Sequence, residues 1–230
     1  MKTPNSIKPI GPLSRGALRH DVVKRLLISI FRGELTPGTR LVAKKLADGM
    51  GISATPVREA LVELEGVGLV QLTHNRGALV KPFGPDQLRQ IFQVRRIFET
   101  EATRCACGVI DPTALEALED ETKRLLSNGE QGNSEWLSRA MAVDRKLHDA
   151  IASQCGNDRL AHEIRRYDTM VQGLREIAGN RLRVQHRAIH EHIPIMQALA
   201  AHDADAAADA MSLHIKEQSI RIEQIVFARK

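Results

Sequence analysis

The stretch from residue 46 to residue 80, LADGMGISATPVREALVELEGVGLVQLTHNRGALV, constrains the fold more than any other part of the chain. A short apolar stripe ends at two glycines, and a second helical pattern begins at Ser53 or Ala54. Pro56 falls in the first turn of that second helix, where its missing N–H is tolerated because those N–H groups have no intrahelical partner. A helix, a short Gly-containing turn and another helix predict a helix-turn-helix.

A β-hairpin is predicted directly after the second helix. Residues 69–73 have the composition of a strand, residues 74–77 that of a turn, and residues 78–80 that of a return strand. The whole stretch therefore predicts a winged helix-turn-helix, with Ser53 as a candidate N-cap of the second helix.

In such a domain the second helix enters the major groove of DNA and presents the polar residues of its first turns to base edges. The candidates are Ser53, Thr55 and Arg58, and Arg58 could bond either a guanine edge or a phosphate. The wing tip could reach phosphate or the minor groove, and its residues are His74, Asn75, Arg76 and Gly77. For any one of these residues, the alternative is an ordinary solvated surface position.

These motifs, together with GELTPGTRL at residues 33–41, resemble the GntR family of bacterial transcription regulators over about residues 15–82. The resemblance implies a double-stranded DNA operator, which a homodimer would bind as a palindrome because two-fold symmetry demands two-fold sites. It places DNA contacts at Lys44, Ser53, Thr55, Arg58, Arg76 and Gly77, with Arg40 in the adjoining turn. Lys44 and Ala54 stand where the family often has Arg, so the operator is expected to differ from those of better-known relatives.

Composition divides the chain in two. Residues 1–84 carry 13 Lys/Arg against 6 Asp/Glu, whereas the remainder carries 20 against 22. Gly and Pro are concentrated in the same first part, and aromatic residues make up only 3% of the chain. We therefore expect a basic DNA-binding domain at 15–82, a linker at 83–86, and an all-helical domain at 87–228 built on aliphatic residues.

Other features bear on the compartment. No apolar run approaches the roughly 18 residues of a membrane span, and residues 1–14 lack a signal-peptide core and are expected to form a disordered arm. The three cysteines are odd in number and lie in helical patterns, so a disulfide framework is not expected. We expect a cytoplasmic protein that does not contact the membrane.

The second half is predicted to be an antiparallel bundle of six helices, which makes the chain mostly α. The breaks contain Gly, Pro, Asn or Asp. The expected helices are 86–107, 112–128, 133–154, 158–178, 181–201 and 204–228. Pro194 falls inside the fifth of them and should either kink that helix or shift its start.

Four motifs in this half resemble the FCD domain of FadR-like GntR regulators. They are VRRIFETEAT, DRKLHDAIASQCGNDRL, the pair EH at 191–192 and the pair LH at 213–214. A domain of six helices rather than seven resembles the VanR-type branch of this group. In this group the first FCD helices usually form a dimer interface, and Phe92, Ile97 and Phe98 could serve that interface or the domain core.

One set of residues suits a metal ion. Asp144 and His148 are four residues apart and share a helix face. His192 and His214 lie equally far from the break near residue 203, so they sit level in an antiparallel helix pair. Three imidazoles and one carboxylate suit zinc, nickel or manganese, and the FCD resemblance places metal ligands at the same positions. The alternative is that each of the four is an ordinary polar residue of its helix. His186 and His190 are two further histidines nearby in the sequence, and His190 could compete for the site if the kink at Pro194 changes the helix phase.

Arg95 matches an arginine that, in the FCD group, points into the effector cavity. A guanidinium group can bind a carboxylate through two parallel hydrogen bonds, so the expected effector is a small carboxylate metabolite. The alternative is a surface ion pair with Glu99, four residues further along.

Three functions compete. The leading one is a metabolite-responsive transcription regulator that is not an enzyme. A metal-dependent hydrolase could use an open site of one Asp and three His, although Glu191, the only neighbouring carboxylate in the sequence, should point roughly 100° away around its helix. The third is an architectural DNA-binding protein without an effector.

Overall fold

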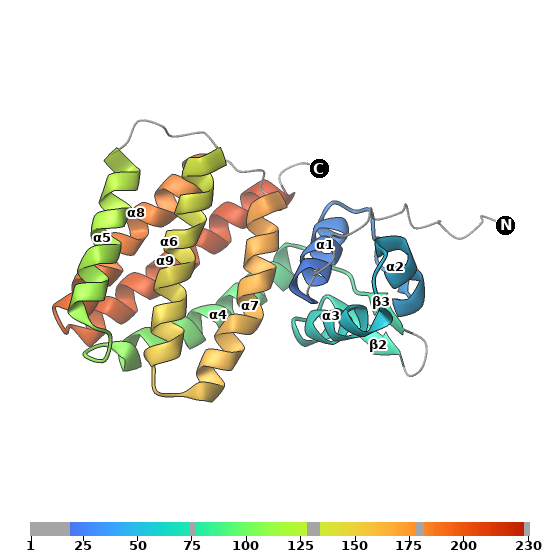
Figure 1. Cartoon of the computed structure of the whole chain (residues 1–230), viewed down its shortest axis with the longest axis horizontal. Helices are drawn as coiled ribbons and strands as arrows, with labels where there is room; N and C mark the ends of the chain where they lie inside the picture. The colour runs from blue at the N-terminus through green and yellow to red at the C-terminus, as the bar shows by residue number, and fades with distance from the viewer. Residues whose placement is uncertain (1–18, 74–76, 128–133, 178–181, 228–230) are drawn as a thin grey trace. The chain divides into compact units, whose positions relative to one another are not determined.

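The computed structural model describes residues 19–73, 77–127, 134–177 and 182–227 of the 230 residues (Figure 1). It divides into two compact units, of which the first comprises residues 1–86 with 166–177 and the second comprises 87–165 with 178–230. No helix in the described ranges is long and apolar enough to cross a membrane. The predicted arm at 1–14 and the wing-tip residues 74–76 lie outside the described residues.

The first unit contains a helix-turn-helix and a small antiparallel sheet, as the sequence predicts. Its elements are α1 (Arg19–Phe31), β1 (Arg40–Leu41), α2 (Ala43–Met50), α3 (Ala54–Gly66), β2 (Val70–Thr73) and β3 (Gly77–Val80). Helix α1 packs on α3 through fully buried aliphatic side chains such as Leu26 and Leu64. The turn after α2 closes at Gly51, whose left-handed backbone lets its N–H bond the carbonyls of Ala47 and Asp48.

The sequence does not predict strand β1, because its two residues fall in a stretch that has the pattern of a turn. In the structure the strand order is β1-β3-β2, with Arg40 opposite Leu79 and Leu41 opposite Ala78. Two residues are too few to show the alternation by which strands are recognised in a sequence. The pairing therefore places Arg40 on the edge of the sheet.

Gly77 has a structural role that the sequence did not indicate. Its φ is +87°, and a Cβ built on it would lie 2.0 Å from the carbonyl oxygen of Leu41. Both the backbone conformation and the close approach of β1 therefore require glycine at this position.

We expect Gly77→Ala to lower the free energy of unfolding by more than about 2 kcal/mol, since it adds a backbone clash to an unfavourable φ. Gly68→Ala is the matched control: its φ is +77°, but nothing lies within 4 Å of the added carbon, so only about 1 kcal/mol should be lost. Urea unfolding of both variants measures the difference, and equal losses would contradict the role given to the clash.

Six helices follow β3 within the described residues. They make up the second unit, called the helical unit below, except that residues 85–86 and 166–177 group with the first. They are α4 (Pro85–Ala106), α5 (Pro112–Ser127), α6 (Ser134–Gln154), α7 (Asp158–Ile177), α8 (Leu182–Ala200) and α9 (Ala204–Phe227). Every predicted boundary is within one residue of these, and the mostly helical fold class is confirmed. Helix α8 packs against α5, α6 and α9, so it lies among the other helices of the bundle (Figure 1).

The hairpin of α8 and α9 turns within three residues. His202 adopts a left-handed backbone with φ 57°, and the carboxylate of Asp203 accepts a hydrogen bond from the Ala206 N–H at 3.0 Å.

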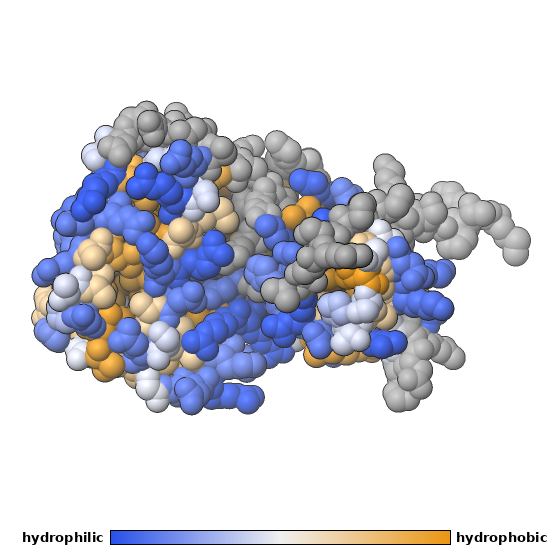
Figure 2. Space-filling model, in the orientation of Figure 1, coloured by the Kyte–Doolittle hydropathy of each residue, from blue (hydrophilic) through white to orange (hydrophobic). Residues whose placement is uncertain are grey.

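Pro194 lies inside α8, twelve residues after its start at Leu182, so the expectation of a shifted start is wrong. Hydrophilic residues cover most of the face of the helical unit that Figure 2 shows.

Candidate metal centre and DNA-binding surface

The structure brings the four predicted metal ligands together inside the helical unit. Asp144 and His148 come from α6, His192 from α8 and His214 from α9, and all four are buried. One ligand atom from each residue lies within 4.8 Å of the others. Sequence spacing predicted this convergence from the level positions of His192 and His214 about the α8–α9 turn.

The arrangement suits a single ion. The Nε2 atoms of His192 and His148 lie 3.4 and 3.9 Å from Oδ1 of Asp144, and the ring centroids of His192 and His214 are 4.7 Å apart. Two ligands on opposite sides of one transition-metal ion are separated by about 4.4 Å, given metal–ligand bonds of about 2.2 Å. A small contraction of the cluster would therefore place all four atoms at bonding distance.

Two carboxylates orient the histidines from outside the cluster. Glu99 on α4 accepts a hydrogen bond from Nδ1 of His148, and Glu191 on α8 accepts one from Nδ1 of His214 at 3.0 Å. A proton fixed on Nδ1 leaves the Nε2 lone pair to bind a metal, which is the usual way that carboxylates support histidine ligands. In the described part of the chain, the buried Nε2 atoms of His148 and His214 have no hydrogen-bond partner.

The expectation that Glu191 points away from the site is wrong. Its Cα lies off the His192 face of α8, but the side chain is long enough to reach α9. Both of its oxygens are also held by Arg221, whose Nη1 and Nη2 each donate at 2.6 Å. A carboxylate fixed in this way acts as a support for His214 and is poorly suited to act as a general base.

Burial and these partners set the protonation states. Burial lowers the pKa of His214 to about 3, against the opposing effect of Glu191, so this ring is neutral at neutral pH. Burial also tends to lower the pKa of His148, but the negative charge of Glu99 outweighs it and raises the pKa. Metal binding at His148 would therefore compete with a proton, and metal affinity should fall as the pH falls.

Arg95 is buried with 1% of its surface exposed. Its Nε lies 2.5 Å from Oε1 of Glu99, and its Nη1 donates to Oε1 of Gln218 on α9. The predicted pair with Glu99 thus exists, but the idea that it lies on the surface is wrong. Burial raises the pKa of Glu99, yet Arg95 and His148 outweigh burial and hold that pKa at about 2.

Three residues belong to the site although the sequence does not predict them there: Glu99, Gln218 and Arg221. Glu99 had a signal, since it stands four residues after Arg95 on one helix face. Arg221 also had one, because it follows His214 by seven residues on the same face of α9. Three residues of α4 are expected to serve either a dimer interface or the domain core. Phe92 is buried, Phe98 is half-buried and Ile97 is 57% exposed.

The predicted DNA-contact residues lie mainly on exposed positions of the first unit. Lys44 lies at the start of α2, and Ser53, Thr55 and Arg58 lie on or just before the first two turns of α3; all four are exposed. Ser53 occupies the N-cap position, but its side chain makes no capping hydrogen bond. Arg40 is exposed on β1, Gly77 begins β3, and Arg76 lies outside the described residues.

Two family models match successive parts of the chain. The model for bacterial regulatory proteins of the gntR family matches residues 18–80, and the FCD domain model matches residues 90–217. A winged helix-turn-helix followed by this domain defines a DNA-binding transcription regulator. The chain belongs to the GntR family, in the group that carries a C-terminal FCD domain.

Individual proteins agree with this assignment. The HTH-type transcriptional repressor RspR of Escherichia coli is 26% identical over 224 residues, which cover 96% of this chain and 92% of RspR. The HTH-type transcriptional regulator LutR of Bacillus subtilis is 28% identical over 211 residues, covering 81% of this chain and 92% of LutR. The structure of E. coli McbR/YncC has the same fold, with a TM-score of 0.64 and 24% identity over 91% of this chain and 99% of McbR.

Proposed function

We propose that this regulator responds to a metabolite, binds a palindromic operator as a homodimer, and holds one divalent ion together with a small carboxylate effector in its FCD domain. The observation that carries the proposal is the buried cluster of Asp144, His148, His192 and His214 within a family of DNA-binding regulators. The ion would be zinc, nickel or manganese, as the nitrogen-rich ligand set suggests.

The geometry supports an effector near the metal. Four protein ligands leave coordination positions open if the ion is five- or six-coordinate, so a carboxylate could complete its shell. Arg95 is linked to the ligand His148 through Glu99, which places a buried guanidinium group beside the cluster. Its Nη2 could neutralise the bound carboxylate while Nε stays on Glu99.

The exposed face of α4 supports the homodimer. Ile97 is 57% exposed and Val94, three residues earlier on the same face, is 36% exposed. A second copy of α4 would cover both side chains.

The proposal also includes the domain limits expected from the sequence, assignment to the VanR-type branch on the basis of six helices, and a cytoplasmic location, where the operator would be found.

No specific observation favours the other two functions. The hydrolase would need a free general base, and Glu191 is engaged by Arg221 and His214. An architectural protein would have no use for a buried cluster of metal-binding residues. The comparisons likewise identify regulators.

The proposal for DNA is tested by Arg58→Ala. Arg58 is exposed on α3 and has no ion-pair partner among the described residues, so its guanidinium group is available to a base or phosphate. An operator is first selected from a random DNA library with the unaltered protein, and it should be palindromic. Arg58→Ala should then weaken binding by about 1–3 kcal/mol, measured by fluorescence anisotropy.

The matched control is Arg32→Ala, which removes an exposed arginine of the same unit outside α2 and α3. It should change operator binding only slightly. Equal binding by the Arg58→Ala variant and the unaltered protein would show that α3 does not read the operator as proposed.

A further inference from the structure

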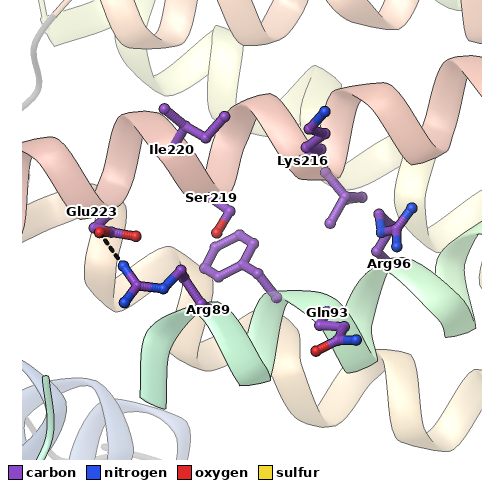
Figure 3. Close-up of a pocket in the computed structure, with 9 residues that line it drawn as sticks. Arg89, Gln93, Arg96, Lys216, Ser219, Ile220 and Glu223 are labelled. Atoms are coloured by element: carbon purple, nitrogen blue, oxygen red, sulfur yellow. Dashed lines mark hydrogen bonds and ion pairs between the residues drawn. The ribbon is translucent and has the colours of Figure 1, made fainter. Parts of the chain in front are cut away.

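A pocket lies in the helical unit between α4 and α9, and none of the four predicted metal ligands is among its lining residues (Figure 3). Its volume is about 390 Å³, within the range of small-molecule sites. Phe92 and Ile215 are almost fully buried and are among the residues that line it. The pocket therefore combines apolar side chains with polar ones and is large enough for a small organic molecule.

The two ends of this pocket differ in charge. At one end Arg89 forms an ion pair with Glu223, so the two charges balance. At the other end Figure 3 shows Arg96 and Lys216, one from each helix. Among the described residues Lys216 has no ion-pair partner, and Arg96 donates only to the neutral hydroxyl of Ser212, at 3.1 Å. This end therefore carries two positive charges that no nearby carboxylate in the described structure compensates.

The pocket and the metal cluster lie on different faces of the same two helices. On α9, His214 and Gln218 face the cluster or Arg95, whereas Lys216 and Ser219 line the pocket. On α4, Phe92 forms the boundary: it lines the pocket, and the guanidinium carbon of Arg95 lies 5.8 Å from its ring centroid. A molecule in the pocket would thus contact Phe92 without reaching the metal ligands.

We propose that this pocket binds a small organic anion with an apolar body, separately from the effector expected at the metal. The carboxylate would bind the guanidinium group of Arg96. The exposed Lys216 side chain points away from Arg96 in Figure 3 and would turn toward the bound anion to donate as well. The apolar body would lie next to Phe92 and Ile215, which have almost no exposed surface of their own, and would cover Ile220, which is 42% exposed.

The probe is 2-naphthoate, an aromatic carboxylate, with the uncharged 2-naphthamide as its matched analogue. Both are titrated into the full metal-loaded chain, and binding is followed by NMR of isoleucine δ1 methyl groups, assigned by single Ile→Val substitutions. Ring-current shifts should appear at Ile215 and Ile220. They should be absent at Ile189 and Ile195, which lie in the core on α8. The amide should bind at least about tenfold more weakly, because it lacks the charge.

Two variants test the role of charge. Arg96→Gln and Lys216→Gln should each weaken naphthoate binding several-fold, and leave the affinity for naphthamide unchanged. Arg187→Gln, which removes an exposed arginine from α8, should change neither affinity, and thermal melting verifies that all three variants are folded.

Three outcomes would overturn the proposal. Shifts confined to Ile189 or Ile195 would place the anion in the bundle interior, and no shift at Ile215 or Ile220 at millimolar naphthoate would show that the groove is closed or covered by a second copy of the chain. Equal naphthoate affinity in Lys216→Gln, Arg96→Gln and Arg187→Gln would show that the positive charges do not recognise the ligand.

Discussion

Replacing both His192 and His214 by alanine should reduce the metal content of the purified protein from about one ion per chain to nearly none. The two imidazoles supply half of the buried ligand set, and they come from two different helices. Asp144 and His148 alone remain on α6, and two ligands on one helix hold a transition metal weakly compared with four. Elemental analysis of the dialysed variant measures the change.

His190→Ala is the matched control, since His190 is exposed on α8 two residues before His192. It should retain the full metal content. The selected operator provides a second readout: the double variant should still bind DNA but lose its response to the effector. If the double variant instead unfolds and loses DNA binding, the ion has a structural role, and full metal occupancy in it would exclude the proposed ligands.

Glu99→Gln should be the most destabilising change of a single carboxylate in the described structure. It would leave the buried Arg95 without its anion and replace the charged acceptor of His148 Nδ1 by a neutral amide. Breaking one partner of a buried ion pair lowers stability by about 3–5 kcal/mol, because an uncompensated charge stays in the interior. The loss of an outer partner of a ligand should also weaken metal binding by about 10–100-fold.

Chemical unfolding of the metal-free protein measures the first effect, and a competition titration with a chelator measures the second. Glu101→Gln is the control, because Glu101 is exposed on the same helix and should change neither quantity. Adding Arg95→Met to Glu99→Gln should recover part of the lost stability, since the unpaired charge is then absent. Equal stability of Glu99→Gln and Glu101→Gln would show that the buried pair is not important for folding.

The pH dependence of the metal-free protein follows from the same residue. The pKa of Glu99 is about 2 in the folded state and 4.5 in its ordinary range. A lowered folded-state pKa contributes stability that is complete above the unfolded value. The contribution should therefore be lost as the pH falls from about 4.5 toward 2, and Glu99→Gln should lack this transition.

The helices could be predicted closely because each carries an amphipathic stripe and ends at residues that break helices. The break at His202 and Asp203 is an example, because it predicts where the turn between α8 and α9 lies. From the position of that turn, His192 and His214 are expected to lie level with one another, and in the structure they are close together. Such reasoning works for residues on one helix or in one hairpin, where the spacing alone determines the geometry.

The contacts that could not be predicted join elements in ways that spacing does not determine. Glu99 reaches His148 from a helix 49 residues earlier, and only the packing of the bundle brings the two together. Strand β1 is defined by its partner β3 rather than by its own two residues. The family resemblance predicts a DNA contact at Gly77, whereas the close approach of Gly77 to Leu41 is seen only in the folded sheet.

Anomalous diffraction from crystals of the full chain grown with the divalent ion tests directly whether one ion is held by Asp144, His148, His192 and His214. We expect one strong anomalous peak per chain, about 2.0–2.2 Å from Oδ1 of Asp144 and from Nε2 of each of the three histidines. A peak only at exposed histidines such as His162 or His202, with the four buried residues unligated, would contradict it.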